Sequence, residues 1–319
     1  MSGCYYPYLY GRQSELYALR NLAEEDRISN NVLPIIEPVS NSKVSIHLLR
    51  SVIQAFRQHH LRIGVVINPV EGISTTALLS SVGLRGNRAV VPVILLTEEA
   101  YEDWDIAQRY AFANPYIVVA REGRYALGGG AEPQIQGLDG IDFSEVVYEG
   151  GNAVKQDVLA SKDILKGLKN FSSAALVDHF HKLSRNADYA EHPDEIFSRD
   201  HLFYSRFDDD GFGDYSVIGS QRPTTGFAAY AVAIHWVYFD RDDILWIHHY
   251  VSDSNDTIRD PGTKFNQAVA KLINDDRAMT TFAARRFRYF FDNELFPGLA
   301  MVKRLSIMHH LELMSNYLS

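Results

Sequence analysis

Polar side chains end several short apolar segments of this sequence. Four of them recur at the same position of successive segments: Glu37 in Ile-Ile-Glu-Pro, Asn68 in Ile-Asn-Pro, Arg121 after Val-Val-Ala, and Asp178 in Leu-Val-Asp. In a parallel α/β fold the carboxyl ends of the strands meet at one edge, where ligands bind. The pattern therefore predicts a shared pocket that offers carboxylate, amide and guanidinium groups. The alternative is that each residue only caps a helix or forms a turn.

A second set of such residues follows position 200: Asp214, His235, His249 and Asp253. Asp214 belongs to FDDDGFGDYSVIG, Phe207 to Gly219, which holds four aspartates and three glycines. It lacks the alternating acids and the final Glu of a calcium-binding EF-hand loop. We interpret it as a flexible acidic loop that brings Asp214 and Ser216 to the mouth of the sheet, with glycines that permit positive φ.

Several well-known chemistries have no sequence support. There is no HExxH motif and no His/Cys cluster with zinc-ligand spacing. Ser220 is not in a GxSxG motif, and Ser216 is interpreted as a turn or strand serine, so no nucleophilic triad is predicted. Neither a Walker A motif nor a GxGxxG after the first predicted strand occurs. His235 lies inside an apolar segment, which favours a buried neutral histidine.

The elements that must position these residues alternate along the first part of the chain. Unbroken β-branched runs predict strands that are covered on both faces, and apolar residues at three- and four-residue spacing predict the helices between them. The predicted strands are 32–37, 63–68, 90–96, 116–120, 145–148 and 174–178, and the predicted helices are 14–24, 44–60, 97–113 and 157–169. Such βα units build a mainly parallel sheet.

The pattern changes after about residue 200. Apolar segments 227–239 and 244–251 flank Asp240-Arg-Asp-Asp243 and predict an antiparallel hairpin. Helices are predicted over 264–274 and 299–318, the last one after Pro297-Gly298. We therefore predict a TIM-barrel-like α/β fold with a hairpin in its C-terminal third. Residues 1–319 would form a single domain, on which the helical segment 264–319 packs.

Composition narrows the class of protein. A formal net charge of −9 and a pI near 5.7 argue against nonspecific duplex binding, which requires an excess of Lys and Arg. Nucleic acid would have to use a local basic patch, for which Ala284 to Tyr289 is the best candidate, although an exposed helix face is the favoured interpretation of this segment. The single cysteine, Cys4, and the lack of a leader or a long apolar segment predict a cytoplasmic protein without a membrane span.

Three stretches together resemble the bacterial and phage "beta protein" family. They are YYPYLYGRQSEL at 5–16, LPIIEPV at 33–39, and GDYSVIG at 213–219, which is followed by AYAVAIH at 229–235 and HYVSD at 249–253. The resemblance would cover nearly the whole chain. It implies a barrel-type α/β protein with a role in phage–host conflict or on mobile elements, without naming a reaction. Its motifs include Glu37, Asp214, His235 and Asp253, and they add Arg12 and Glu15.

The leading functional hypothesis is a barrel whose strand-end pocket binds a small anionic or nucleotide-like ligand, or a partner protein encoded nearby. Positive charge would come from Arg12, Arg121 and Arg222. Glu37, Asn68 and Asp178 would fix the orientation of the ligand.

Two alternatives remain open at this stage. One is a phosphodiester hydrolase dependent on Mg²⁺ or Mn²⁺, in which Asp178, Asp214 and Asp253 hold the metal and His235 or His249 acts as general base. The other is a non-enzymatic subunit of a defence complex that uses its tyrosine-rich N-terminal region for aromatic surface contacts.

Overall fold

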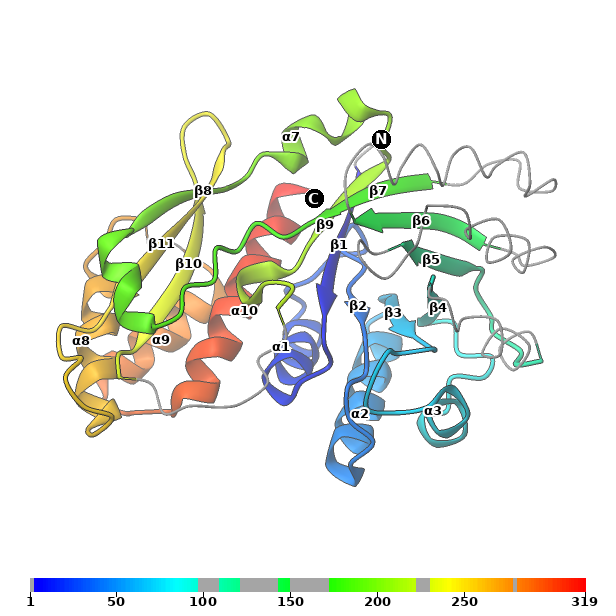
Figure 1. Cartoon of the computed structure of the whole chain (residues 1–319), viewed down its shortest axis with the longest axis horizontal. Helices are drawn as coiled ribbons and strands as arrows, with labels where there is room; N and C mark the ends of the chain where they lie inside the picture. Colours follow the sequence, from blue (N-terminus) through cyan, green and yellow to red (C-terminus); the bar gives the residue numbers. More distant parts are fainter. Residues whose placement is uncertain (1–2, 97–108, 121–142, 150–171, 222–229, 278–279) are drawn as a thin grey trace.

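The centre of the protein is a closed barrel of eight parallel strands (Figure 1). The computed structural model describes residues 3–96, 109–120, 143–149, 172–221, 230–277 and 280–319. The barrel strands, in spatial order, are β1 (Cys4–Leu9), β2 (Ile35–Ile36), β3 (Ile63–Val66), β4 (Val90–Leu95), β5 (Tyr116–Ala120), β6 (Phe143–Glu149), β7 (Ser172–Val177) and β9 (Gly211–Asp214). The predicted TIM-barrel-like α/β fold is confirmed.

Alternate residues along each strand fill two separate cores, because successive side chains of a strand point to opposite faces. One cluster contains Tyr6, Tyr8, Ile35, Val93 and Val119 and has the membership expected of the barrel interior. The alternate positions, such as Tyr5 and Leu9, pack in a second and larger cluster with the helices. The N-terminal tyrosines are therefore buried and offer no aromatic contact surface to a partner, contrary to that hypothesis.

The stretch Gly211–Asp214 is a barrel strand, so its interpretation as a flexible acidic loop was wrong. β9 pairs in parallel with β7 on one side and with β1 on the other, which closes the barrel. Gly211 and Gly213 of this strand do not have positive φ, whereas Gly219, beyond the strand, has φ of 70°. A Cβ on Gly213 would lie 2.6 Å from the backbone oxygen of Tyr6, so glycine is needed there for close approach of two strands.

Helices cover the outside of the barrel where the chain is described. α1 (Gln13–Glu24) and α2 (Lys43–Gln58) bury one apolar stripe each, through residues such as Leu19 and Phe56. A short helix that the sequence pattern did not predict, α3 (Thr75–Val82), begins at the Ser74 cap and ends at Gly83 in the left-handed region. The predicted helix 157–169 and most of the predicted helix 97–113 lie outside the described residues, and 109–113 is turn and loop.

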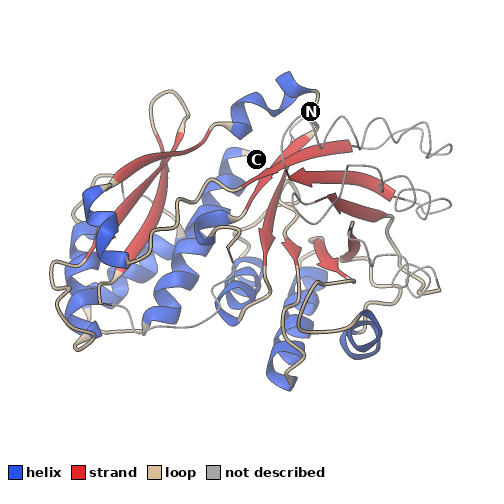
Figure 2. Ribbon diagram, in the orientation of Figure 1, coloured by secondary structure: helices blue, strands red, loops and turns tan. Residues whose placement is uncertain are grey.

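A separate antiparallel sheet stands beside the barrel (Figure 2). It contains the predicted hairpin, now β10 (Ala233–Phe239) and β11 (Leu245–Val251), and β8 (Asp194–Ser198), which pairs with β11. β8 comes from the segment between β7 and β9, together with the short helices η2 (Asn186–Glu191), α7 (Asp200–Phe203) and η3 (Tyr204–Phe207).

The last helices complete this part of the molecule. α8 (Pro261–Ile273) contacts β10 and β11, and α9 (Phe282–Asp292) packs on α8. α10 (Leu299–Tyr317) contacts α1, α9, β10 and the short η4 (Ser216–Ile218). It lies between the barrel and the small sheet (Figure 1). One hydrophobic cluster runs from Leu19 of α1 to Trp236 of β10 and Phe287 of α9. That the chain forms a single domain remains a prediction.

Candidate functional site

A pocket of about 260 Å³ opens where the barrel, the small sheet and α10 meet. Its lining combines the residues after barrel strands with residues of the small sheet and of α10, among them Tyr10, Arg12, Lys182, Gly219, His235 and Lys303. Tyr10 and Arg12 follow β1, Lys182 follows β7 and Gly219 follows β9. The pocket thus lies at the carboxyl ends of three neighbouring barrel strands, which is where ligands bind in this class of fold.

Three cationic side chains and one carboxylate line this pocket: Arg12, Lys182, Lys303 and Glu15. Glu15 is almost completely buried at 1% exposure, and its Oε1 lies 3.3 Å from Nζ of Lys303. Its other oxygen accepts a hydrogen bond from the backbone N–H of Arg12 at the start of α1. Among the described lining residues three cations thus accompany one carboxylate, in a protein whose formal net charge is −9.

The cations are close enough to influence one another. Burial lowers the pKa of Lys182, and the positive charges of Lys303 and Arg12 lower it further, whereas Asp178 raises it. The ammonium group of Lys182 donates a hydrogen bond to the backbone oxygen of Gln221. Like charges gathered in this way repel one another until an anion neutralises them.

Apolar side chains form most of the remaining wall. Phe180, Tyr189, Val217, Val232 and Val302 all line the pocket and are buried. A small number of polar groups set in an apolar wall is typical of pockets for small molecules.

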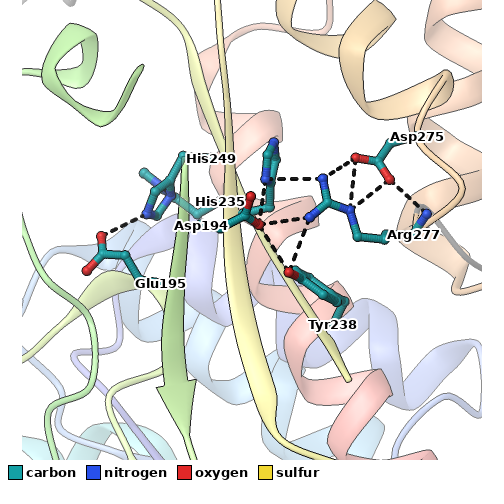
Figure 3. A network of polar contacts seen from close by, with 8 residues as sticks. Asp194, Glu195, His235, Tyr238, His249, Asp275 and Arg277 are labelled. Carbon is teal, nitrogen blue, oxygen red and sulfur yellow. Dashed lines mark hydrogen bonds and ion pairs between the residues drawn. The ribbon is translucent and has the colours of Figure 1, made fainter. Parts of the chain in front are cut away.

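His235 is the predicted catalytic residue that the structure places in this pocket. Its ring lies against the edges of Phe180 and Tyr189, with centroids 4.9 and 4.7 Å away. Nδ1 of His235 is 2.9 Å from Nδ1 of His249, and Nε2 of His249 is 3.4 Å from Oε1 of Glu195. His249, the other histidine predicted to be catalytic, is 4% exposed, contacts His235 and does not line the pocket. The two histidines are therefore brought together, as Figure 3 illustrates with Glu195 beside them.

Both histidines are neutral at neutral pH. Burial lowers the pKa of His235 well below its usual value, and His249 lowers it further. Burial also lowers the pKa of His249 to about 4, although Glu195 acts in the opposite direction.

Asp178 shapes the rim of the pocket and does not line it. Its Oδ1 accepts a hydrogen bond from the backbone N–H of Phe180, and its Oδ2 accepts one from that of Ser220. The carboxylate thus ties the segment after β7 to the segment after β9. Both of these segments contribute lining residues, so Asp178 is a positioning residue for the pocket.

Glu37 and Asn68 lie elsewhere, and their predicted role as ligand-binding residues finds no support in the geometry. Asn68 is buried, and its amide exchanges two hydrogen bonds with the backbone of Leu95, each of 2.9 Å. Glu37 is fully buried and accepts hydrogen bonds from the hydroxyl of Tyr8 and the backbone N–H of Val70. Both side chains satisfy buried polar groups at the ends of strands.

Asp214 belongs to a buried network behind the pocket. Its Oδ1 accepts hydrogen bonds from the hydroxyl of Tyr5 at 2.6 Å and from the backbone N–H of Ser216 at 2.7 Å. Oδ2 lies 3.7 Å from Nε2 of His310, whose Nδ1 is 3.0 Å from the hydroxyl of Ser216. Burial raises the pKa of Asp214 to about 6.

This combination of Ser, His and Asp is not arranged as a nucleophilic site. Ser216 is 1% exposed, His310 is fully buried, and neither lines the pocket described above. The serine has φ of 51°, a left-handed conformation that the contacts of Asp214 and His310 hold in place. We assign the network to fixing the end of β9 against α10.

The three aspartates predicted as metal ligands do not come together. Asp178 and Asp214 have the separate partners given above, and the exposed Asp253 pairs with Nζ of Lys271 at 2.7 Å. Among the residues that the structure describes, no group of three His, Cys, Asp or Glu side chains is arranged to hold a metal ion. The carboxylate set that the hydrolase hypothesis required is therefore not assembled by this fold.

The basic segment 284–289 forms part of α9. Ala284 and Phe287 face the core, whereas Arg285 and Arg288 donate to the backbone oxygens of Thr280 and Ile273. Arg286 lies over the ring of Tyr289. These contacts fit the simpler interpretation, an exposed helix face, and give no support to a nucleic-acid surface.

A second polar network lies on the small sheet and in the turn after α8 (Figure 3). Arg277 pairs with Asp194 at 2.8 Å and with Asp275 at 2.6 Å, and its guanidinium lies over the ring of Tyr238. His248 also contacts Asp194. Each charge here has a partner of opposite sign, so the network ties the turn after α8 to the sheet.

Sequence reasoning missed three residues of the site: Lys182, Lys303 and Glu195. None ends an apolar run, and Lys182 and Glu195 come from the excursion between β7 and β9. The only signal was the mixture of cations and histidines around 179–182. Arg121 and Arg222, which were predicted to bind the ligand, lie outside the described residues.

Within the described part of the chain, no helix has both the length and the apolar character needed to cross a bilayer. Comparison of the chain with models of protein families, with curated proteins and with solved structures gave no match in any of the three. Membership of the beta protein family therefore remains a prediction from the sequence motifs.

Proposed function

We propose that this protein binds a small anionic ligand in the pocket between the barrel, the small sheet and α10. The observation that carries the proposal is the convergence of Arg12, Lys182 and Lys303 on one apolar-walled pocket at the carboxyl ends of barrel strands. Arginine and lysine donate charge-assisted hydrogen bonds to phosphate and carboxylate oxygens, which are stronger than neutral ones.

The size of the pocket limits the ligand. A volume of about 260 Å³ is smaller than the range of roughly 300–1,000 Å³ that is common for drug-sized ligands. A phosphate or carboxylate group on a short carbon skeleton suits this volume, and the apolar wall suits the skeleton. The resemblance to the beta protein family adds the expectation that such a ligand acts in phage–host conflict.

Binding of simple anions tests the proposal. Isothermal titration at low salt with inorganic phosphate, n-propyl phosphate and AMP should show binding of at least one of them to the wild type. Lys182→Gln should weaken that binding by about tenfold, which corresponds to about 1.4 kcal/mol. The Lys182 side chain is exposed and makes no ion pair with a buried group, so its replacement should leave the fold intact.

Lys271→Gln is the matched control. Like Lys182, Lys271 is exposed and donates to a backbone oxygen, that of Val251, and it also pairs with the exposed Asp253. Lys271 belongs to α8 and does not line this pocket. It should bind the anions like the wild type. Equal weakening by Lys182→Gln and Lys271→Gln would mean nonspecific attraction, and no binding of any of the three anions would refute the proposal. Lys303→Gln is less suitable, because it removes the ion-pair partner of the buried Glu15.

A further inference from the structure

A chain of polar contacts leads through the small sheet into the pocket. It begins at Glu195 on β8, continues through His249 on β11 and ends at His235 on β10. His235 and His249 are directly paired across the antiparallel strands, so both rings stand on the same face of the sheet. Glu195 is opposite Ile247, which places it on that face as well.

The carboxylate of Glu195 determines which ring nitrogens of His249 and His235 carry protons. A carboxylate accepts hydrogen bonds and attracts an N–H group, so Glu195, 3.4 Å away, favours the tautomer of His249 that carries its proton on Nε2. Because His249 is neutral, its Nδ1 is then an acceptor. Nδ1 of His235 must therefore carry a proton and donate it across the 2.9 Å contact. In a neutral imidazole this leaves Nε2 of His235 with a lone pair and no proton.

Nothing in the described part of the chain uses this lone pair. His235 makes T-shaped ring contacts with Phe180 and Tyr189, and its polar contact with a described residue is made by Nδ1. The side chain is only partly buried and lines the pocket. Among the described lining residues, the charged side chains other than Glu15 are cationic, and Glu15 is already engaged with Lys303 and the backbone of Arg12.

We propose that Nε2 of His235 is the hydrogen-bond acceptor that selects the ligand, and that the ligand is an anion which also carries a hydroxyl group. This rests on the proposed function and narrows the class of ligand. Arg12, Lys182 and Lys303 bind the anionic group, and the hydroxyl donates to His235. Glu195 and His249 are positioning residues, since they act only by holding His235 in the tautomer that accepts.

The tautomers can be measured without any ligand. Long-range ¹H–¹⁵N correlation spectra of the histidine rings distinguish a protonated from an unprotonated ring nitrogen. In the wild type at neutral pH, His235 should be protonated at Nδ1 only and His249 at Nε2 only. In Glu195→Gln the new amide can donate as well as accept, so His235 should no longer be held as a single Nδ1–H tautomer. A wild-type His235 that is protonated at Nε2 would overturn the proposal.

Selectivity is tested with two probes of the same carbon number, n-propyl phosphate and glycerol 3-phosphate. The wild type should bind glycerol 3-phosphate more tightly, by about fivefold or more, as expected for one additional hydrogen bond. Both His235→Phe and Glu195→Gln should abolish this preference, so that the two probes bind each variant with about equal affinity. Glu195→Gln should not change the affinity for n-propyl phosphate by more than about twofold, because Glu195 does not line the pocket and the cations remain in place.

The outcomes separate this inference from the proposed function. If both probes bind the wild type equally well, the anion site stands and the role of His235 is refuted. If neither probe binds, both the proposed function and the proposed class of ligand are refuted. If His235→Phe removes the preference but Glu195→Gln retains it together with the Nδ1–H tautomer, His235 is the acceptor but Glu195 is not its positioning residue. Thermal unfolding of each variant checks that the fold is retained.

Discussion

At the scale of single residues, Asp214 shows how burial decides what a carboxylate can do. The sequence motif suggested a catalytic or metal-binding acid, but the folded chain surrounds it with Tyr5, Ser216 and His310. Burial raises the pKa of Asp214 to about 6. Because the pKa is raised in the folded state, the neutral acid is favoured by folding. This contribution to stability is present below the unfolded pKa and is lost as the pH rises through about 6.

We expect Asp214→Asn to remove this contribution, so that the variant loses about 1 kcal/mol more stability than the wild type between pH 7 and pH 5. The amide oxygen can still accept from Tyr5 and from the backbone of Ser216, so the variant should be at least as stable as the wild type at pH 7.5. Between pH 7 and pH 5 the wild type should gain about 1 kcal/mol from Asp214, and the variant should not. Urea unfolding at both pH values measures the difference.

Asp214→Ala is the control for this comparison. It leaves the buried hydroxyl of Tyr5 and the N–H of Ser216 without their acceptor, so it should lose about 1–3 kcal/mol at both pH values. An Asp214→Asn variant as unstable as Asp214→Ala at pH 7.5 would show that the negative charge itself is required.

The candidate site was only partly predictable from the sequence. Arg12 was identified through the N-terminal motif of the family resemblance, and His235 as a polar residue of an apolar segment that also belongs to these motifs. Asn68 and Glu37 were assigned to the ligand because a polar residue at a strand end looks the same whether it meets a ligand or a neighbouring backbone. The amide of Asn68 meets Leu95 on the adjacent strand. Lys182 and Lys303 are distant in sequence, so only the fold could bring them together.

At the scale of elements, β9 is the strand on which closure of the barrel depends. It has four residues, two of them glycine, and its neighbours β1 and β7 approach it closely. Long β-branched runs identified most of the other strands, because such runs are typical of strands buried on both faces. A glycine-rich strand has no such signature, and the aspartates around it made the segment look like a solvated loop.

Gly213→Ala should therefore destabilise the protein by about 2 kcal/mol or more, since its Cβ would collide with backbone. Gly262→Ala is the matched control. In α8 a Cβ at that position would lie 3.7 Å from its nearest neighbour, Phe296, which is an ordinary contact, and alanine is the better helix former. That variant should be as stable as the wild type or more so. Chemical denaturation of the two variants compares them, and equal stability would argue against close strand contact at Gly213.

At the scale of the whole molecule, neutral histidines lie where α10 packs between the barrel and the small sheet. Five described histidines have pKa values that are lowered chiefly by burial: His201 in α7, and four at this junction, which are His235 and His249 on the hairpin and His309 and His310 on α10. His309 stacks on Trp236 with ring centroids 3.5 Å apart, and the pKa of each α10 histidine falls to about 3. α10 therefore contacts the sheet and η4 through rings that become costly to keep buried in acid.

The sign of the effect follows from linkage. The unfolded chain binds protons at these histidines below about pH 6.5 while the folded chain does not, so stability falls as the pH falls from there toward the folded pKa values. At pH 5 each such histidine costs about 2 kcal/mol. Asp214 and His179 act in the opposite direction, because burial raises the pKa of Asp214 and Asp200 raises that of His179, but four histidines outweigh them.

We therefore expect the free energy of unfolding to fall by several kcal/mol between pH 7.5 and pH 5. His309→Gln should lose stability at pH 7.5, because it gives up the stack on Trp236, but its loss between the two pH values should be smaller than that of the wild type by about 2 kcal/mol. His47→Gln, on the exposed surface of α2, should follow the wild type at both pH values. A wild-type protein as stable at pH 5 as at pH 7.5 would mean that these rings are protonated in the folded state, and that the contact of α10 with the sheet accommodates charge.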